Sequence, residues 1–224
     1  VRDTPGIRRV VSEAFEALGR IDVVVSNAGY GLFGAAEEAD DGQIERQIAT
    51  NLTGSIQLIR AALPHLRDQG GGRIVQVSSE GGQMAYPNFS LYHATKWGIE
   101  GFVESVAREV APFGIEFLIV EPGPTETHFA AGLVRARPLD CYEDTPAGDV
   151  RRALASGSFP VKGDAGRTVE AVIATVDAQR PPFRLTLGST AYASIKEALA
   201  GRLTALEAQK ATALSADRDE AGAR

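Results

Sequence analysis

The chain has 224 residues, a formal net charge of -6, a pI near 5.2 and 44% hydrophobic residues. This hydrophobic content suits one sizeable core in a single domain. The acidic balance, without a run of Lys or Arg, argues against nucleic acid or a membrane surface as the partner. A single cysteine, Cys141, excludes an internal disulfide framework, and three histidines without ligand spacing predict no metal site. We find no apolar run of about 18 residues and no signal-peptide pattern, so we expect a cytoplasmic protein.

The first part of the chain alternates helix and strand signals. A cap, a proline and an apolar stripe of helical spacing predict a helix from Thr4 to Gly19. The non-alternating apolar run IDVVVSNAG (21–29) predicts a buried strand. Helical periodicity over 43–67, with a bend expected at Pro64, precedes the predicted strand RIVQVSS (73–79).

The remaining elements continue this alternation. A long apolar stripe predicts a helix from Tyr92 to about residue 111, and IEFLIVEPG (115–123) predicts a strand. Helix and strand in strict alternation predict a parallel sheet covered on both faces. Residues 124–165, rich in Pro, Gly and charge, predict a long and partly helical excursion. The last predicted elements are a helix at 165–178, a strand at 184–187, a helix from about 190 to 210 and a flexible tail at 214–224.

The stretch LYHATK places Tyr92 and Lys96 four residues apart, on one face of the predicted helix. A neighbouring ammonium favours tyrosinate, so we expect the phenol pKa to fall from about 10 toward neutrality. Such a phenol can protonate a carbonyl oxygen as hydride arrives, or deprotonate an alcohol as hydride leaves. An exposed tyrosine and lysine pair is the alternative explanation of this spacing.

Polar and small residues gather where the predicted strands end. Ser79 ends one strand thirteen residues before Tyr92, Asn27-Ala28-Gly29 ends another, and Glu121-Pro122-Gly123 ends a third. In a parallel sheet, functional groups collect beyond these carboxyl ends. Asn51 lies inside a helical segment where its amide is unfavourable, and a side chain bonded to nearby backbone is the alternative to a functional role.

Together, SNAG, NLTG, the serine thirteen residues before YHATK, and EPGPTET resemble the short-chain dehydrogenase/reductase family in order and spacing. VSNAGYGLFG, YHATKWGIEGF and VAPFGIEFLIVEPG are most similar to its 17β-hydroxysteroid and retinol dehydrogenase-like group. The resemblance implies a Rossmann-like three-layer α/β sandwich with a parallel sheet. It also implies an NAD(P)-dependent oxidoreductase that interconverts a secondary alcohol and a ketone or aldehyde by hydride transfer.

By the same resemblance, Tyr92 is the catalytic acid/base and Ser79 polarises the substrate oxygen. Lys96 lowers the tyrosine pKa and binds the nicotinamide ribose, while Asn51 holds a water that relays protons. Ser78 lies one residue too far from the tyrosine to match the family serine. The resemblance assigns cofactor contacts to nine residues: Asn27, Ala28, Gly29, Tyr92, Lys96, Pro122, Gly123, Thr125 and Thr127.

The chain departs from the family at its start. The glycine-rich turn TGxxxGxG, which meets the cofactor pyrophosphate, does not occur in these residues. We therefore expect residues 1–213 to form a partial Rossmann-type domain without the family's strands one to three, roughly 50–60 residues by βαβ unit length. On this interpretation, Val1 lies inside a longer natural product, and Val23-Val24-Val25 forms an exposed apolar edge.

The apolar residues of the 124–165 insertion and of the 80–91 loop predict a lid-covered pocket for a small lipophilic carbonyl or alcohol substrate, unless they only pack these loops. The cofactor is NAD or NADP, with NADP favoured, although the residues that decide between them lie outside this sequence. Family resemblance implies a homodimer or homotetramer packed through the helices at 43–67 and 92–111.

Two other hypotheses compete with a dehydrogenase. One is a non-catalytic scaffold or binding partner that docks its edge strand onto another protein, although such a scaffold does not need all four predicted catalytic residues. The other is a nucleotide-sugar epimerase, which shares the YxxxK pattern but has a larger C-terminal substrate domain than this chain provides.

Overall fold

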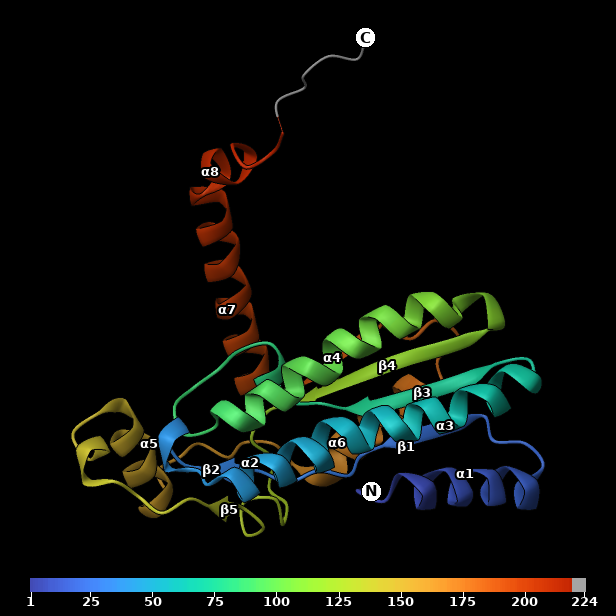
Figure 1. The fold of residues 1–224 in the computed structure, drawn as a ribbon, viewed down its shortest axis with the longest axis horizontal. Coiled ribbons are helices and arrows are strands. Elements are labelled where there is room, and N and C mark those ends of the chain that lie inside the picture. Colours follow the sequence, from blue (N-terminus) through green and yellow to red (C-terminus); the bar gives the residue numbers. More distant parts are fainter. Residues whose placement is uncertain (219–224) are drawn as a thin grey trace.

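The computed structural model describes residues 1–218, so residues 219–224 of the predicted tail lie outside the described part of the chain. Helices and strands alternate along it, with short helical turns marked η (Figure 1). The elements are α1 (Thr4–Leu18), β1 (Val23–Ser26), β2 (Leu32–Phe33), η1 (Ala36–Glu38), α2 (Asp41–Ile48), η2 (Ala49–Thr53), α3 (Gly54–Asp68), β3 (Gly72–Val77), η3 (Glu80–Gly82), α4 (Ser90–Val110), η4 (Ala111–Phe113), β4 (Ile115–Pro122), β5 (Val134–Arg135), η5 (Asp140–Tyr142), α5 (Pro146–Ala155), α6 (Ala165–Val176), β6 (Arg184–Leu187), α7 (Ser189–Ala208) and α8 (Lys210–Leu214).

The central sheet has the strand order β1-β3-β4-β6, and every neighbouring pair is parallel. Its register places Val24 opposite Ile74, and Ile74 opposite Phe117. Among the described residues, β1 lies at the edge of the sheet, where Val25 is 53% exposed. The predicted parallel sheet and its apolar edge strand are therefore confirmed for this part of the chain.

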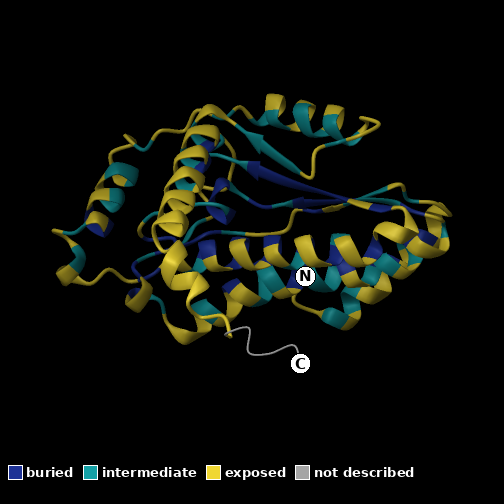
Figure 2. Ribbon diagram, turned by 90° about the horizontal axis from the view of Figure 1, so that it is seen from above, coloured by how far each residue is buried: buried dark blue, intermediate teal, exposed yellow. Residues whose placement is uncertain are grey.

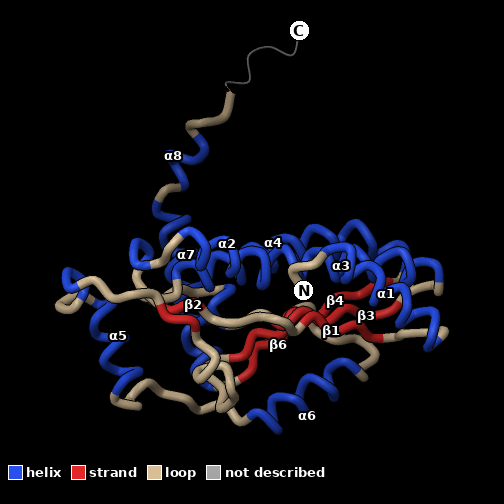
Figure 3. Tube along the Cα trace, turned by 60° about the horizontal axis from the view of Figure 1, so that its bottom comes forward, coloured by secondary structure: helices blue, strands red, loops and turns tan. Residues whose placement is uncertain are grey.

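Helices cover the two faces of the sheet. Figure 3 shows α1, α3 and α4 on one side and α6 on the other. The larger core lies under α1, α3 and α4, where Ile59, Leu66 and Ile99 are fully buried, and Figure 2 shows the strands and inward helix faces as the buried layer. A smaller core joins the opposite face of the sheet to α6. No helix among the described residues combines the length and the apolar character needed to cross a lipid bilayer.

The segment predicted as one helix over 43–67 is divided into three. Residues 49–53 form a π-helical turn, in which the Gly54 N–H bonds the Ala49 carbonyl five residues earlier. The helix α3 continues through Pro64, and the break in the predicted helix falls at η2, where none was predicted. π-turns often occur at functional sites, and this one places Asn51 in the interior with 2% exposure.

The excursion over 124–165 is partly helical, as predicted, but its anchoring was not anticipated. Strand β5 pairs with β2 in a second, two-stranded parallel sheet. The fully buried Glu38 carboxylate accepts hydrogen bonds from the Ala35 and Leu139 N–H groups and forms an ion pair with Arg151 on α5. These contacts hold the excursion against the main body, whereas α7 projects away from it (Figure 1).

Candidate active site

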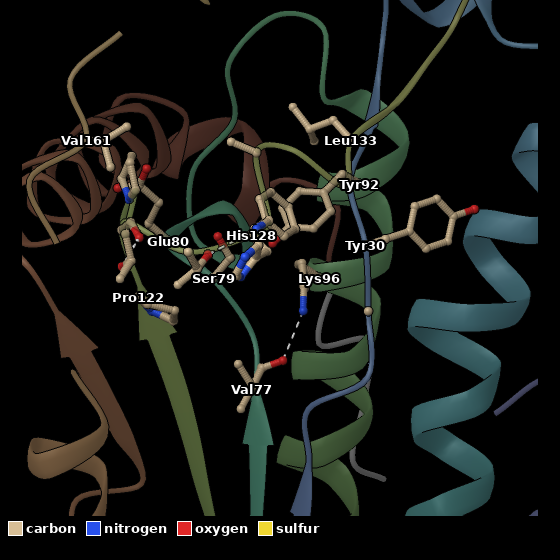
Figure 4. A pocket seen from close by; sticks show the side chains of 18 of the residues that line it. Tyr30, Val77, Ser79, Glu80, Tyr92, Lys96, Pro122, His128, Leu133 and Val161 are labelled. Carbon is tan, nitrogen blue, oxygen red and sulfur yellow. Dashed lines mark hydrogen bonds between the residues drawn. The ribbon is translucent and has the colours of Figure 1, made fainter. Parts of the chain in front are cut away.

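The candidate site is a cavity of about 700 Å³ beyond the carboxyl ends of β1, β3 and β4. Side chains from the start of α4 and from the turn after β3 point into it, as Figure 4 shows for Tyr92, Lys96 and Ser79. The three strands are neighbours and run parallel, which is why groups far apart in the sequence meet here.

The helix α4 brings Tyr92 and Lys96 together. Both side chains are buried, with 7% and 6% exposure, and the Lys96 Nζ lies 5.6 Å from the centre of the Tyr92 ring. The same ammonium donates a hydrogen bond of 3.0 Å to the carbonyl of Val77, the last residue of β3 (Figure 4). The alternative of an exposed surface pair is therefore wrong.

The predicted shift of the tyrosine pKa toward neutrality is also wrong in this structure. Burial raises the pKa of Tyr92 to about 12, although a hydrogen bond to the Ser79 hydroxyl opposes this rise. Burial lowers the pKa of Lys96 to about 8, and the nearby carboxylate of Glu100 opposes that change. The physical reason is desolvation, which is the largest cause of both changes and disfavours the charged form of each group.

The two neighbouring serines have different partners. The Ser79 Oγ lines the cavity and accepts a hydrogen bond of 3.1 Å from the Gly81 N–H, which caps η3. The Ser78 hydroxyl instead donates to the buried Glu100 carboxylate on α4. Both serines line the cavity, but the Ser78 hydroxyl is bonded to Glu100, and the choice of Ser79 as the contact for a substrate oxygen stays a prediction.

Asn51 supports the loop that follows β1. Its Oδ1 accepts a hydrogen bond of 3.1 Å from the Tyr30 N–H, and its Nδ2 donates one of 2.8 Å to the Tyr30 carbonyl. A longer contact of 3.4 Å joins Nδ2 to the Thr95 hydroxyl, beside Lys96. Backbone bonding, the alternative kept open for Asn51, is therefore present, and the proton-relay role stays a prediction.

Most of the predicted cofactor-contacting residues line the cavity. Besides Tyr92 and Lys96, these are Asn27, Gly29, Pro122, Gly123, Thr125 and Thr127. Ala28 is not in the lining. A Cβ added to Gly29 would lie 3.3 Å from the Asn51 Oδ1, and one added to Gly123 would lie 3.1 Å from the Thr190 Oγ1, so a side chain at either position would require its neighbour to shift.

The sequence interpretation missed a network of charges next to the cavity. Arg184 on β6 bonds the carboxylates of Glu100, Glu104 and Glu121. Burial raises the pKa of Glu121, and the neighbouring Glu100 raises it further. Glu100 lies four residues after Lys96, so helical spacing places both residues on the same face of the helix. Nothing in the sequence indicates that Arg184 is the partner of Glu100.

Glu80, which also lines the cavity, was missed as well. It is 4% exposed, and burial raises its pKa. Its only sequence signal is its place directly after Ser79.

The family model described as short chain dehydrogenase matches residues 1–138. The 3-ketodihydrosphingosine reductase of Bacteroides thetaiotaomicron is 32% identical over 189 residues, covering 84% of this chain and 70% of that protein. The 17-beta-hydroxysteroid dehydrogenase type 1 of Homo sapiens is 35% identical over 129 residues, which cover 58% of this chain and 39% of that protein. A short-chain dehydrogenase from Streptomyces avermitilis, known from a crystal structure, is 34% identical in sequence. The two structures align with a TM-score of 0.87 over 96% of this chain and 78% of that one.

These matches confirm the family resemblance and the Rossmann-like fold predicted from the motifs. They agree with the parallel sheet and with a site at the carboxyl ends of its strands. The chain belongs to the short-chain dehydrogenase family, whose members are NAD(P)-dependent oxidoreductases.

Proposed function

We propose that this oxidoreductase interconverts a lipophilic secondary alcohol and a ketone, with Tyr92 as the catalytic acid and base. The observation that carries the proposal is the convergence of Tyr92, Lys96 and Ser79 in one cavity. The apolar side chains that line the same cavity support a lipophilic substrate; they include Tyr86, Phe89, Phe129, Leu133 and Leu154.

The residues present fit the nicotinamide and ribose end of the cofactor. Gly29 and Gly123 leave backbone uncovered in the cavity, and Lys96 supplies a buried ammonium that can donate hydrogen bonds to ribose hydroxyls. When bound, the nicotinamide supplies or accepts the hydride.

In ketone reduction, the Tyr92 hydroxyl gives its proton to the substrate oxygen, which the Ser79 hydroxyl holds by a hydrogen bond. Because the pKa of Tyr92 is raised to about 12, its neutral form dominates at pH 7, and the neutral form is the proton donor. In alcohol oxidation, the same oxygen must accept a proton as tyrosinate. A higher pH increases the tyrosinate form that oxidation needs.

Changing Tyr92 to Phe tests the proposal. We expect kcat to fall by ~10²–10⁴-fold, the usual contribution of a general acid or base. The free energy of unfolding should change little, because the ring and its packing remain. Tyr192→Phe, which removes a hydroxyl from an exposed tyrosine on α7, is the matched control. A Tyr92→Phe enzyme that turns over at the wild-type rate would sink the assignment.

Several finer points stay predictions. NADP is favoured over NAD, a homodimer or homotetramer is expected from the family resemblance, and a cytoplasmic location stays an expectation from the sequence pattern. Cofactor titration calorimetry with NADPH and then NADH tests the first point, and sedimentation equilibrium tests the oligomeric state.

A further inference from the structure

The buried carboxylates of this protein follow one pattern, with a single exception. Among residues 1–218, four glutamates are buried, namely Glu38, Glu80, Glu100 and Glu121. Glu38 forms an ion pair with Arg151, and both Glu100 and Glu121 form ion pairs with Arg184. Burying an ionised carboxylate is unfavourable unless it is paired or hydrogen-bonded, and arginine meets this need at three of the four positions.

Glu80 is the exception. Within residues 1–218, no lysine or arginine pairs with it, and its side chain has one hydrogen-bond contact, at 3.3 Å to the Ser194 hydroxyl on α7. A serine hydroxyl carries a single proton, and Ser194 also lies 2.6 Å from the Thr190 carbonyl. The Ser194 hydroxyl therefore donates its hydrogen bond to the nearer Thr190 carbonyl, which leaves the buried Glu80 carboxylate without a strong hydrogen bond from the described residues.

The position of Glu80 points to a partner outside the protein. It lines the same cavity as Tyr92 and Lys96, and it directly follows Ser79, so their Cα atoms are separated by about 3.8 Å. Figure 4 shows both residues at the same side of the site. Besides burial, the negative charge of Glu80 raises the pKa of both Tyr86 and Tyr92, so its carboxylate lies in the neighbourhood of two hydroxyls that line the cavity. The remaining wall, which includes Phe89, Phe129 and Leu133, is apolar.

We propose that Glu80 determines substrate specificity by accepting a hydrogen bond from an amino or hydroxyl group on the carbon next to the reacting carbon. This inference rests on the proposed function and narrows it to lipophilic amino or hydroxy ketones and the corresponding alcohols. An ammonium group fits best, because it supplies the positive charge that arginine supplies to the other three buried glutamates.

A matched set of alcohols tests this assignment. The probes are octan-2-ol, octane-1,2-diol and 1-aminooctan-2-ol, which share a chain and differ only at the carbon next to the reacting one. We expect the wild-type enzyme with NADP to show at least a tenfold higher kcat/KM for 1-aminooctan-2-ol than for octan-2-ol, with the diol between them. Glu80→Gln should reduce this ratio at least tenfold, whereas Ser194→Ala should leave it within about twofold.

The controls separate a specificity role from a structural one. A folding defect changes kcat/KM for all three probes alike, so it does not move the ratio. A wild-type ratio near one, or a ratio that Glu80→Gln leaves unchanged, would overturn the assignment of Glu80. A change confined to NADPH affinity would overturn it too, because Glu80 would then bind the cofactor.

Binding distinguishes this inference from the proposed function. Turnover of the probes depends on the proposed function and on Glu80 together, whereas Tyr92→Phe tests the proposed function and binding tests Glu80. Titration calorimetry of 1-aminooctan-2-ol and octan-2-ol into the enzyme with NADPH tests Glu80 alone. Tighter binding of the amino alcohol that is lost in Glu80→Gln supports the inference, and equal binding of the two probes refutes it.

Discussion

Replacing Lys96 with Met should make the protein more stable while abolishing turnover. The side chain is 6% exposed, and burial lowers the pKa of its ammonium from 10.5 to about 8. Because one pKa unit corresponds to ~1.4 kcal/mol, keeping this group charged in the folded protein costs roughly 3 kcal/mol at neutral pH. Met is unbranched and apolar, so it fills the same space without that cost.

The loss of one hydrogen bond offsets part of this gain. Lys96 donates to the Val77 carbonyl, a contact worth about 1 kcal/mol. Gln76 also donates to this carbonyl, at 3.0 Å, so the acceptor keeps a partner in the variant. We therefore expect the free energy of unfolding to rise by ~2 kcal/mol at pH 7.

The pH dependence gives a second check on the same reasoning. Below pH 8, Lys96 is charged in both the folded and the unfolded chain, so its full cost is present. Between pH 8 and 10.5 the unfolded chain binds more protons than the folded one. The free energy of unfolding of the wild type therefore increases with pH in this window, whereas Lys96→Met lacks this contribution. The advantage of the variant should thus shrink over this window.

Urea unfolding followed by circular dichroism at pH 7 and at pH 9.5 measures both effects. Lys196→Met, at an exposed position on α7, should change stability by less than ~0.5 kcal/mol and serves as the control. A Lys96→Met protein less stable than the wild type at pH 7, or a difference independent of pH, would refute the desolvation argument.

Two further predictions concern the charge network next to the cavity. Arg184→Met leaves Glu100 and Glu121 buried without their cation and should lower the free energy of unfolding by ~3–5 kcal/mol, measured by urea denaturation. Gly82→Ala places a methyl group onto the Glu100 carboxylate and should lower stability by ~1–3 kcal/mol. Gly101→Ala is its control in the same experiment: α4 leaves this position open, so alanine should stabilise the helix by ~0.5–1 kcal/mol. Wild-type stability in either of the first two variants would contradict the packing described for Glu100.

The sequence by itself determined the order of the elements and the sheet they form. Apolar periodicity is a local property, so the strand at 184–187 was predicted at its observed position, and the helix predicted from Thr4 to Gly19 ends one residue earlier, at Leu18. The meeting of Ser79 with Tyr92 also followed, because parallel strands end at one edge and the helix starts there. The π-turn at 49–53 was not predicted, since its hydrogen bonds shift by one residue without a change in the apolar pattern.

Only the tertiary structure decided how the site residues are charged. Spacing placed Lys96 beside Tyr92 and predicted a lowered phenol pKa, whereas burial raises that pKa to about 12. Desolvation depends on everything that surrounds a group, and the surroundings of Tyr92 come from segments scattered along the chain. For the same reason the sequence did not single out Glu80. Its carboxylate is buried without an arginine partner among the described residues, and this depends on which residues are neighbours in space rather than in sequence.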